Sequence, residues 1–524
     1  MNKRIFSLLL IVPLLVACTK PATIAIGGET EISVYYDGGS NTISVTSDQD
    51  WTATSSAAWV KVSPESGAAS DQPVTVTITS EPNPGQEERT ATVTIAAGGT
   101  SKTVTVTQEA APDYYAKAAP ELKNGDVVLA NSELTEKFLT EVNYPDKDLS
   151  FTKIFDYYGG FNGKDLNWSN WQANWPNGDK PNSYSIRWAP TADYVGYKLQ
   201  LSDKLGWSRE QEIKAGTYYV DITNLVPNDK YTYKVTTNDD NKTVVAEGTF
   251  ETTGHLHQVF FKGNCRNARD LGGWKTESGK TLKYRKIYRG GRMNDKWETM
   301  LTSTGKKDVQ AEGIRAELEL RGSDDYCEKP ALEEFDYCKP VIEEGGKVML
   351  GVSKPSAKNC AKWLKFDQGR SEIDVSAYSP TQAEYDAFQV AYKAKTKECF
   401  EFVMNCVKNN KPVYFHCSLG RDRTGTMGVL IMGVLGVREG DISKEYELTY
   451  FAPVGFSVSS SDKTNNPEPI FKNDRTHWVY SDIVPYFWQK AGSGSFASGV
   501  EKYLVEEAGV SKAAIDEFRS LMLE

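Results

Sequence analysis

The stretch Val413–Gly425 reads VYFHCSLGRDRTG and decides the fold of the C-terminal part of the chain. Its apolar residues at 413–415 predict a short strand, and the residues from Thr424 onward have the spacing of a helix. A strand joined to a helix by a short loop is typical of an α/β domain. We therefore expect residues 256–524 to form one α/β domain. Its other helices are expected at 381–408, 441–450 and 511–523, with Asp441 and Ser511 as N-caps.

The loop between this strand and helix has the composition of a phosphate-binding site. Cys417 and Arg423 bracket five residues whose backbone amides can point inward and add to the positive end of the helix dipole. Such a field lowers the pKa of a thiol, and the thiolate is the nucleophilic form of cysteine. The guanidinium of Arg423 offers a planar fork to two phosphoryl oxygens. The predicted phosphate contacts are Ser418, Leu419, Gly420, Arg421 and Arg423.

The same residues carry a resemblance. His416-Cys417, five residues and then Arg423-Thr424 resemble the His-Cys-x5-Arg-Ser/Thr signature of the cysteine-dependent protein tyrosine phosphatase superfamily. The resemblance implies that Cys417 is the nucleophile and that Arg423 binds phosphate. It also implies that Thr424 aids release of the thiolate and that His416 orders the loop. The alternative, an inert buried cysteine in a turn, does not account for the strand–loop–helix context.

Other stretches narrow the resemblance to a bacterial tyrosine/lipid phosphatase branch, over nearly the whole of residues 256–524. They are NARDLGG at 267–273, YRGG at 288–291, GIR at 313–315 and LELR at 318–321. Where that branch carries Lys-Asp within the loop, this chain has Arg421-Asp422, which keeps the charge and leaves the detailed preference open. Glu319 stands where the branch often has aspartate.

The proton donor for the leaving oxygen is less evident. Many relatives carry an aspartate on a separate upstream loop, but no Trp-Pro-Asp occurs here, and the contexts of Asp367, Asp374 and Asp386 do not resemble it. Asp422 lies inside the phosphate loop, within the reach that a general acid needs, and the resemblance implies this position. The alternative, that the Asp422 carboxylate only neutralises Arg421, stays open.

The N-terminal part of the chain predicts a first β-sandwich. Residues 24–110 alternate small polar and β-branched residues, as in VTVTI at 74–78. DW at 50–51, WVKVSP at 59–64 and VTQ at 106–108 resemble the BACON module, which the resemblance links to carbohydrate binding. Trp51 and Trp59 are interpreted as core residues rather than as sugar platforms.

A second β domain is expected at 113–254, with an irregular N-terminal extension in which 132–142 predicts a short capped helix. Strands resume at Ser183, and LVPNDKY at 225–231 resembles the tyrosine corner of a fibronectin type III domain, in which Tyr231 ties a loop to a strand. This domain is interpreted as a spacer or docking surface.

Residues 1–18 predict where in the cell the protein is located. Lys3-Arg4 precedes an apolar run to Ala17 that is too short to span a bilayer, which is typical of a secretory signal. The run ends in LVAC, which resembles the bacterial lipobox, so Cys18 is expected to be lipidated and to become the new N-terminus. The protein would then be held at the cell envelope, anchored but not spanning the membrane. The alternative is that Cys18 is an ordinary buried cysteine.

Composition limits the partners. Lys+Arg 60 against Asp+Glu 70 in 524 residues gives a formal net charge of −10, so no global positive field exists to bind nucleic acid. The chain has four histidines and no Cys/His set with the spacing of a zinc site. We therefore expect neither a metal nor another cofactor.

These patterns predict a multidomain chain with two all-β sandwiches followed by an α/β protein tyrosine phosphatase-like domain. The resemblance implies hydrolysis of phosphomonoesters through a cysteinyl-phosphate, on a phosphorylated protein, lipid or inositol phosphate. Arg421 adds a cation that favours multiply charged substrates, yet phosphotyrosine fits the same loop. Because every proposed site residue lies beyond residue 255, the last domain is expected to work alone. The alternative is a glycan-binding surface lipoprotein whose phosphatase domain is vestigial.

Overall fold

The computed structural model describes residues 21–524 apart from the segments named next. The segments left out are 37, 84–86, 111–116, 148–178, 191–194, 263–264, 266, 295–300, 323–328, 341–355 and 452–481. Cys18 and the predicted signal segment lie outside the described residues. The chain divides into two compact units, Met1–Lys117 and Ala118–Glu524. Among the described helices, none is both long enough and apolar enough to cross a membrane.

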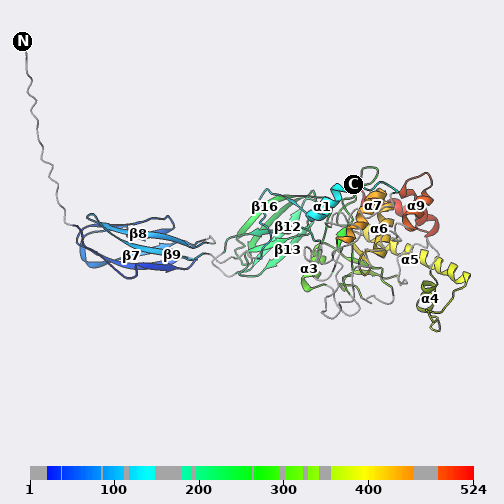
Figure 1. Ribbon diagram of the computed structural model, residues 1–524, viewed down its shortest axis with the longest axis horizontal. Coiled ribbons are helices and arrows are strands. Elements are labelled where there is room, and N and C mark those ends of the chain that lie inside the picture. The colour runs from blue at the N-terminus through cyan, green and yellow to red at the C-terminus, as the bar shows by residue number, and fades with distance from the viewer. Residues whose placement is uncertain are drawn as a thin grey trace, which may run out of the picture. The chain divides into compact units, whose positions relative to one another are not determined.

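The N-terminal unit is a β-sandwich, as predicted, with its strands seen in blue in Figure 1. One sheet has the order β1 (Ile24–Gly27), β3 (Gly39–Ser47), β7 (Ser70–Ser80), β5 (Val60–Ser63). The other has the order β2 (Glu31–Val34), β9 (Thr100–Gln108), β8 (Arg89–Ala97), β4 (Trp51–Ser55), β6 (Ser66–Gly67). Along β8 every second residue from Ala91 to Ala97 is buried, because successive side chains of a strand point to opposite faces.

The two tryptophans of this unit differ in exposure. Trp51 is 2% exposed and belongs to the core, as predicted. Trp59 is half-buried, and the guanidinium carbon of Arg89 lies 4.2 Å from the centroid of its ring. Arg89 therefore covers one face of the Trp59 ring, as a cation–π contact does. Trp51 cannot offer a ring face to a sugar in this fold.

A second β-sandwich begins the larger unit. Its first sheet has the order β10 (Val127–Leu129), β16 (Val244–Thr253), β15 (Lys230–Thr237), β12 (Tyr197–Asp203), β13 (Ser208–Ile213), and its second sheet pairs β11 (Tyr184–Arg187) with β14 (Tyr219–Ile222). The tyrosine corner is confirmed, because the Val226 amide donates to the Tyr231 phenol oxygen at 2.8 Å. The expected helix is α1 (Glu133–Glu141), where the Ser132 hydroxyl accepts from the Thr135 amide.

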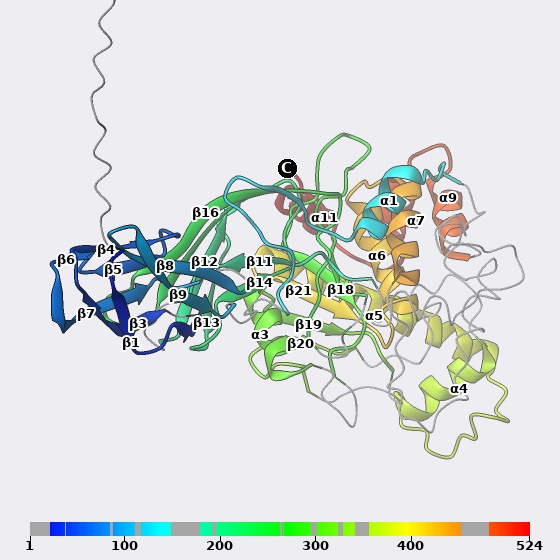
Figure 2. The ribbon, with the colours of Figure 1, turned by 60° about the vertical axis from the view of Figure 1, so that its left-hand side comes forward.

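The α/β domain is built on a sheet of order β17 (Arg269–Asp270), β18 (Ile287–Gly290), β21 (Val413–His416), β19 (Ala316–Glu319), β20 (Asp336–Cys338). The central strand β21 is parallel to both of its neighbours, and all of its residues are buried. Figure 2 shows this sheet together with α6. The helices are α3 (Ser303–Ala311), α4 (Ala357–Phe366), α5 (Gln382–Lys408), α6 (Asp422–Val434), α7 (Glu439–Glu447), α9 (Val484–Ala491), α10 (Phe496–Lys502) and α11 (Lys512–Met522), with a 3₁₀ turn at Leu448–Tyr450 and a π turn at Tyr503–Glu507.

One of the two predicted helix caps needs a correction. α7 starts earlier than expected, so Asp441 lies in its first turn and Arg438 occupies the N-cap. Asp441 there meets the positive end of the helix and accepts from Arg438 at 3.3 Å, which explains the wrong assignment. Ser511 holds the N-cap position of α11 but makes no side-chain cap bond. By contrast, Thr381 forms a full capping box with Glu384 at the start of α5.

The extension that contains α1 shares one hydrophobic core with the α/β domain. Phe138, Leu139, Val142 and Tyr144 belong to the same buried cluster as residues of β21 and α6. The ring centroids of Phe138 and Phe451 lie 5.4 Å apart in an edge-to-face arrangement. The predicted division at residues 254/256 stays a prediction, but apolar packing is continuous across it.

Polar contacts cross the same division. The buried Arg285 pairs with Asp203 of β12, and its guanidinium carbon lies 4.3 Å from the centroid of the Trp207 ring. The indole N–H of Trp207 donates to the Ala311 carbonyl at 2.7 Å. The sandwich edge at β12–β13 is therefore joined to the end of α3 and to the residues before β18.

Candidate active site

The phosphate loop lies where β21 ends and α6 begins. Cys417 follows the last residue of β21, and Arg421 is the N-cap of α6, so the loop amides stand at the positive end of that helix. Gly420 has a φ of +72°, and a Cβ at this position would lie 2.4 Å from the carbonyl carbon of Gly290. Only glycine fits here, since the loop packs directly on the backbone after β18.

Cys417 has the electrostatic surroundings of a thiolate. The residue is 3% exposed, and burial by itself raises the pKa of a thiol. The charge of Arg423, together with the Thr424 side chain and backbone amide beside the sulfur, outweighs burial, so the pKa of Cys417 lies below its ordinary value. Other cysteines of this domain show the opposite direction, because burial raises the pKa of Cys338 and Cys406 to about 12. The ionisable thiol is therefore a property of this loop.

Arg423 is fixed from behind the loop. Its side chain is 8% exposed, and Nη1 donates to the Leu320 carbonyl at 3.1 Å. Leu320 in turn donates its amide to the His416 carbonyl at 2.8 Å, at the end of the β19–β21 pairing. The run LELR thereby aligns the guanidinium that is predicted to bind phosphate.

The NARDLGG and YRGG stretches hold the loop by its carbonyl groups. Asn267 Nδ2 donates to the Gly420 carbonyl at 2.9 Å and to the Leu419 carbonyl at 3.3 Å. Arg289 Nη2 donates to the same Gly420 carbonyl at 2.5 Å. In a trans peptide the carbonyl and the following N–H point in opposite directions, so carbonyls held on one side direct the next amides toward the other. These amides are the groups expected to bind phosphate.

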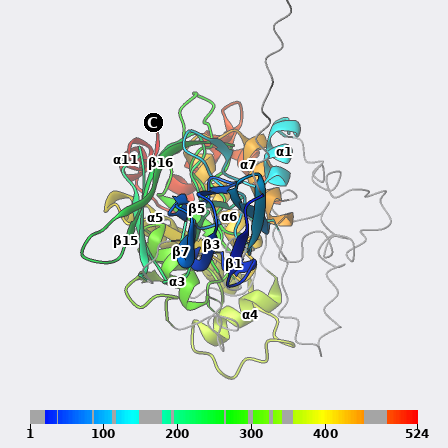
Figure 3. The same cartoon turned by 90° about the vertical axis from the view of Figure 1, so that its left-hand side faces the viewer.

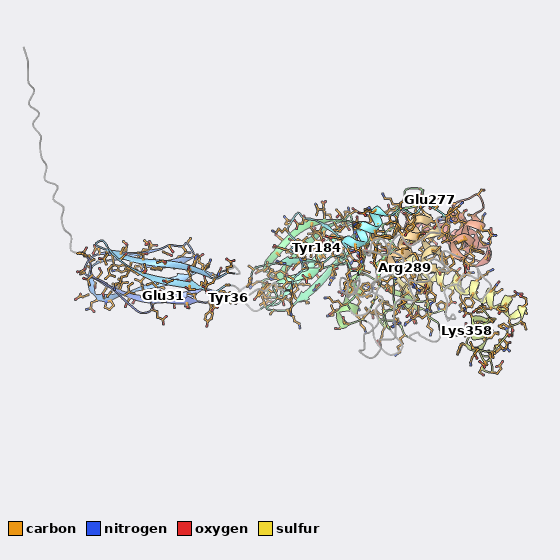
Figure 4. The ribbon with its side chains drawn as sticks, in the orientation of Figure 1. Glu31, Tyr36, Tyr184, Glu277, Arg289 and Lys358 are labelled. Atoms are coloured by element: carbon orange, nitrogen blue, oxygen red, sulfur yellow. The ribbon has the colours of Figure 1, made fainter. Side chains whose placement is uncertain are left out.

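Asn267 and Arg289, which hold the loop carbonyls, are called the clamp. One buried carboxylate, Glu445, orients Arg289 directly and Asn267 through Arg269. Glu445 accepts from Arg269 Nε at 2.6 Å and from Arg289 Nη1 at 2.6 Å. Arg269 also donates to both oxygens of Asn267. Figure 4 labels Arg289 within the α/β domain. The sequence analysis missed Glu445, which sits on α7 without a local pattern that marks it.

His416 lies between two buried carboxylates. Its Nε2 is 2.8 Å from Glu317 Oε1, and its Nδ1 is 3.1 Å from the Cys417 carbonyl and 3.9 Å from Glu319 Oε1. Burial lowers the pKa of His416, but the charges of Glu319 and Glu317 outweigh it and raise that pKa. With an acceptor at each ring nitrogen, the imidazolium form fits best and orders the loop backbone.

Glu317, Glu319 and His416 are also spaced as metal ligands, with one atom of each within 4.8 Å of the others. Their oxygens are already engaged, since Glu317 Oε2 accepts from the Ala331 amide at 2.7 Å and Glu319 accepts from the Arg321 guanidinium. The cluster is therefore explained as support for the loop.

Charged side chains also lie at the rim of the loop. Arg421 Nε lies 3.0 Å from Asp422 Oδ1, and the Asp422 side chain is 34% exposed. The pair is the contact expected for the neutralising role of Asp422, and the general-acid role stays a prediction. Arg292, which the sequence analysis missed although it directly follows YRGG, donates from Nη1 to the Ser418 hydroxyl at 2.5 Å.

The upstream aspartates have other surroundings. Asp374 accepts from Ser376, and Asp386 accepts from Gln382 on α5. Asp367 ends α4 and lines a pocket of about 530 Å³ between α4 and α5, where burial raises its pKa to about 6. The structure thus brings together all predicted loop residues, whereas these three carboxylates have their described contacts outside the loop.

Comparison with known families agrees with this geometry. The model of the tyrosine phosphatase family matches residues 262–524, just over half of the chain. The BACON family, whose description is that of an N-terminal binding domain, matches residues 49–109. Both matches were expected from the sequence.

Two curated relatives each match about a third of the chain. A protein of Cupriavidus necator that bears the name of a tyrosine-protein phosphatase is 25% identical over 187 residues, 34% of this chain and 59% of the relative. A tyrosine-protein phosphatase of Nostoc commune is 21% identical over 170 residues, 32% of this chain and 50% of the relative. The chain thus spans between half and three-fifths of the length of these relatives.

Solved structures resemble the chain weakly. A Bacteroides ovatus GH5 xyloglucanase in complex with a XXXG heptasaccharide is 25% identical, with 21% of this chain and 28% of that chain covered and a TM-score of 0.16. A segment of two fibronectin type III domains from chicken tenascin is 14% identical, with 44% and 99% covered and a TM-score of 0.13. At these TM-scores the likeness says nothing of function.

Proposed function

Because the chain belongs to the tyrosine phosphatase family, we propose that it hydrolyses phosphomonoesters through a covalent cysteinyl-phosphate on Cys417. The observation that supports this most is the lowered pKa of a buried thiol at a helix N-terminus, next to Arg423 and Thr424. A cysteine kept only for packing would have a raised pKa.

In the first step the Cys417 thiolate attacks phosphorus, an S–P bond forms and the ester P–O bond breaks. Arg423 and the loop amides neutralise the equatorial oxygens, which is the main contribution a protein makes to phosphoryl transfer. Asp422 gives its proton to the leaving oxygen, since it is the carboxyl group at the loop.

In the second step a water molecule attacks phosphorus. Its oxygen forms the new P–O bond, its proton passes to the Asp422 carboxylate, and the S–P bond breaks to return the Cys417 thiolate. The Thr424 hydroxyl stabilises the departing thiolate, because its hydrogen bond favours the charged sulfur. No other reactant is needed for this balance.

We infer the substrate class from the charges at the rim of the loop. Arg421 and Arg292 add two cations beside Arg423, which supports multiply phosphorylated substrates such as phosphoinositides or inositol phosphates. Phosphotyrosine on proteins remains the alternative, and the names of the curated relatives support it.

The location is proposed from the sequence. The signal segment with Cys18 supports a lipid anchor at the cell envelope, with the BACON-like module next along the chain. That module supports a binding role, with carbohydrate as the proposed partner. The rival function, a glycan-binding lipoprotein with a vestigial phosphatase domain, accounts poorly for the complete phosphate loop.

The test is hydrolysis of an aryl phosphate by the full chain, followed by a panel of phosphotyrosine peptides, phosphoserine peptides and inositol phosphates. Turnover should survive EDTA, be blocked by vanadate and be lost in Cys417→Ser, because the thiolate is the nucleophile. Cys406→Ser, a buried thiol with a raised pKa, is the matched control and should retain turnover. Turnover that persists in Cys417→Ser would contradict the proposal, and an inactive wild type that binds glycan would favour the rival.

A further inference from the structure

α1 and the residues after it lie against α7. They precede residues 262–524, the region that the phosphatase family model matches, whereas α7 lies within it. Figures 1, 2 and 3 all show α1 beside α7. Lys444 Nζ donates to the Leu139 carbonyl at 3.1 Å, and Arg438 Nη2 donates to Asn143 at 3.2 Å. The end of α1 and the residue pair that follows it thus make hydrogen bonds with α7 of the catalytic domain.

Residues 144–147 continue these contacts along α7. The Tyr144 phenol donates to Glu447, and both side chains are fully buried. The Lys147 amide donates to Glu439 Oε2 at 2.7 Å. A Cβ on Gly440 would lie 2.0 Å from the Tyr144 carbonyl oxygen, so the two backbones are in direct contact. Both ends of α7 are therefore fixed by one segment.

Other residues of α7 contact the groups that hold the phosphate loop. Glu445 holds Arg269 and Arg289, which in turn fix Asn267 and the Gly420 carbonyl. A Cβ on Gly425 of α6 would lie 2.6 Å from the Tyr446 ring, so α7 also packs tightly on the helix that begins at the loop. A shift of α7 would move the clamp and α6 together.

We propose that residues 138–147 are a positioning element of the phosphate loop, acting through α7 and Glu445 on the carbonyls that aim the loop amides at phosphate. This inference rests on the proposed function for its kinetic part. Tyr144 acts through its hydrogen bond to Glu447, so its role is positional. Interiors are close-packed, and a displaced helix is therefore felt by the side chains packed on it.

The test compares two tyrosine-to-phenylalanine variants of the full chain. Tyr144→Phe removes the phenol that fixes α7. Tyr184→Phe removes a phenol that donates to the Leu129 carbonyl at 2.8 Å within the second sandwich, where Figure 4 labels Tyr184. The affinity of inorganic phosphate is measured by its protection of Cys417 from iodoacetamide, and kcat and KM are measured on an aryl phosphate.

We expect phosphate affinity and kcat/KM to fall by roughly 2- to 30-fold in Tyr144→Phe, the range of energetic coupling through packed networks. Tyr184→Phe should match the wild type. Lys444→Met, which loses the bond to Leu139 at a half-exposed site, should show a smaller loss and serves if Tyr144→Phe does not fold.

Normal phosphate affinity in Tyr144→Phe and Lys444→Met would overturn the inference, even with a lowered melting temperature, since the segment would then be structural only. Phosphate protection does not require turnover. A wild type that is protected by phosphate but hydrolyses nothing would therefore refute the proposed function and leave the positioning role measurable.

Discussion

The N-terminal sandwich and the second sandwich are built from similar alternating strands, yet they bury their apolar residues differently. The core of the first runs from Ala22 to Val106 and forms one cluster within its own unit. The extension of the second, with Phe138 and Tyr144, is part of the catalytic core. The alternating strand pattern predicts that a sandwich forms, but it does not predict whether that sandwich folds independently of its neighbour. We therefore treat residues 118–524 as the catalytic body and residues 1–117 as an accessory unit.

Truncation should produce the largest contrast. Removal of residues 1–117 should leave kcat/KM on an aryl phosphate unchanged, because no residue of the phosphate loop or its clamp is lost. Removal of residues 1–254 should abolish stable folding, since it takes away Phe138, Leu139 and Val142, whose burial contributes roughly 5–9 kcal/mol together. That is comparable with a typical total stability of about 5–15 kcal/mol. Size-exclusion chromatography and turnover of the two truncations measure the difference, and an active chain starting at residue 255 would break the comparison.

The polar junction should give the next largest effect. Asp203→Ala leaves the buried Arg285 guanidinium without its nearest carboxylate, and breaking a buried pair costs about 3–5 kcal/mol. Urea unfolding of the 118–524 protein measures it. Glu210→Ala, which breaks an exposed pair with Lys198 on the neighbouring strand, is the matched control and should cost far less stability, because exposed pairs are screened by solvent. Equal losses in the two variants would mean that the junction does not stabilise the catalytic body.

A core substitution in the accessory unit should act locally. Trp51→Ala empties a fully packed site and should destabilise that unit by about 3–5 kcal/mol. In a calorimetric scan of the full chain, only the transition of residues 1–117 should move, and turnover should be unchanged. A simultaneous shift of both transitions would show that the two units unfold together.

The smallest expected effect concerns the charge at the site. The pKa of Cys417 lies below its ordinary value, so iodoacetamide should react at a lower pH than with a free thiol. Arg423→Gln removes the nearest positive charge and should move the alkylation profile to higher pH. Deletion of residues 1–117 should leave the profile in place, because none of the charges around Cys417 lies in that unit.

The sequence predicts the parts of this account that depend on local pattern. The strand, loop and helix at 413–434, the helix that begins after Thr381 and the tyrosine corner at Tyr231 are each set by residues close together in the chain. The phosphate loop was predicted for the same reason.

Tertiary partners were not predictable. Glu445 is one of several acidic residues on α7, and only its placement between Arg269 and Arg289 gives it a role. Phe138 and Leu139 predict an apolar helix face but not the surface that covers it. The expectation that a chain from residue 255 works alone followed from the location of the site residues, and the shared core now leads us to expect the opposite.

The most direct test of the account is to locate the phosphoryl group during turnover by the 118–524 protein. Acid quench of the reaction, followed by peptide mass spectrometry, should find phosphate on Cys417 in the wild type and none in Cys417→Ser. Phosphate on another residue, such as Ser418, or full turnover by the 118–524 protein with no phosphorylated peptide, would contradict the proposed chemistry of this loop.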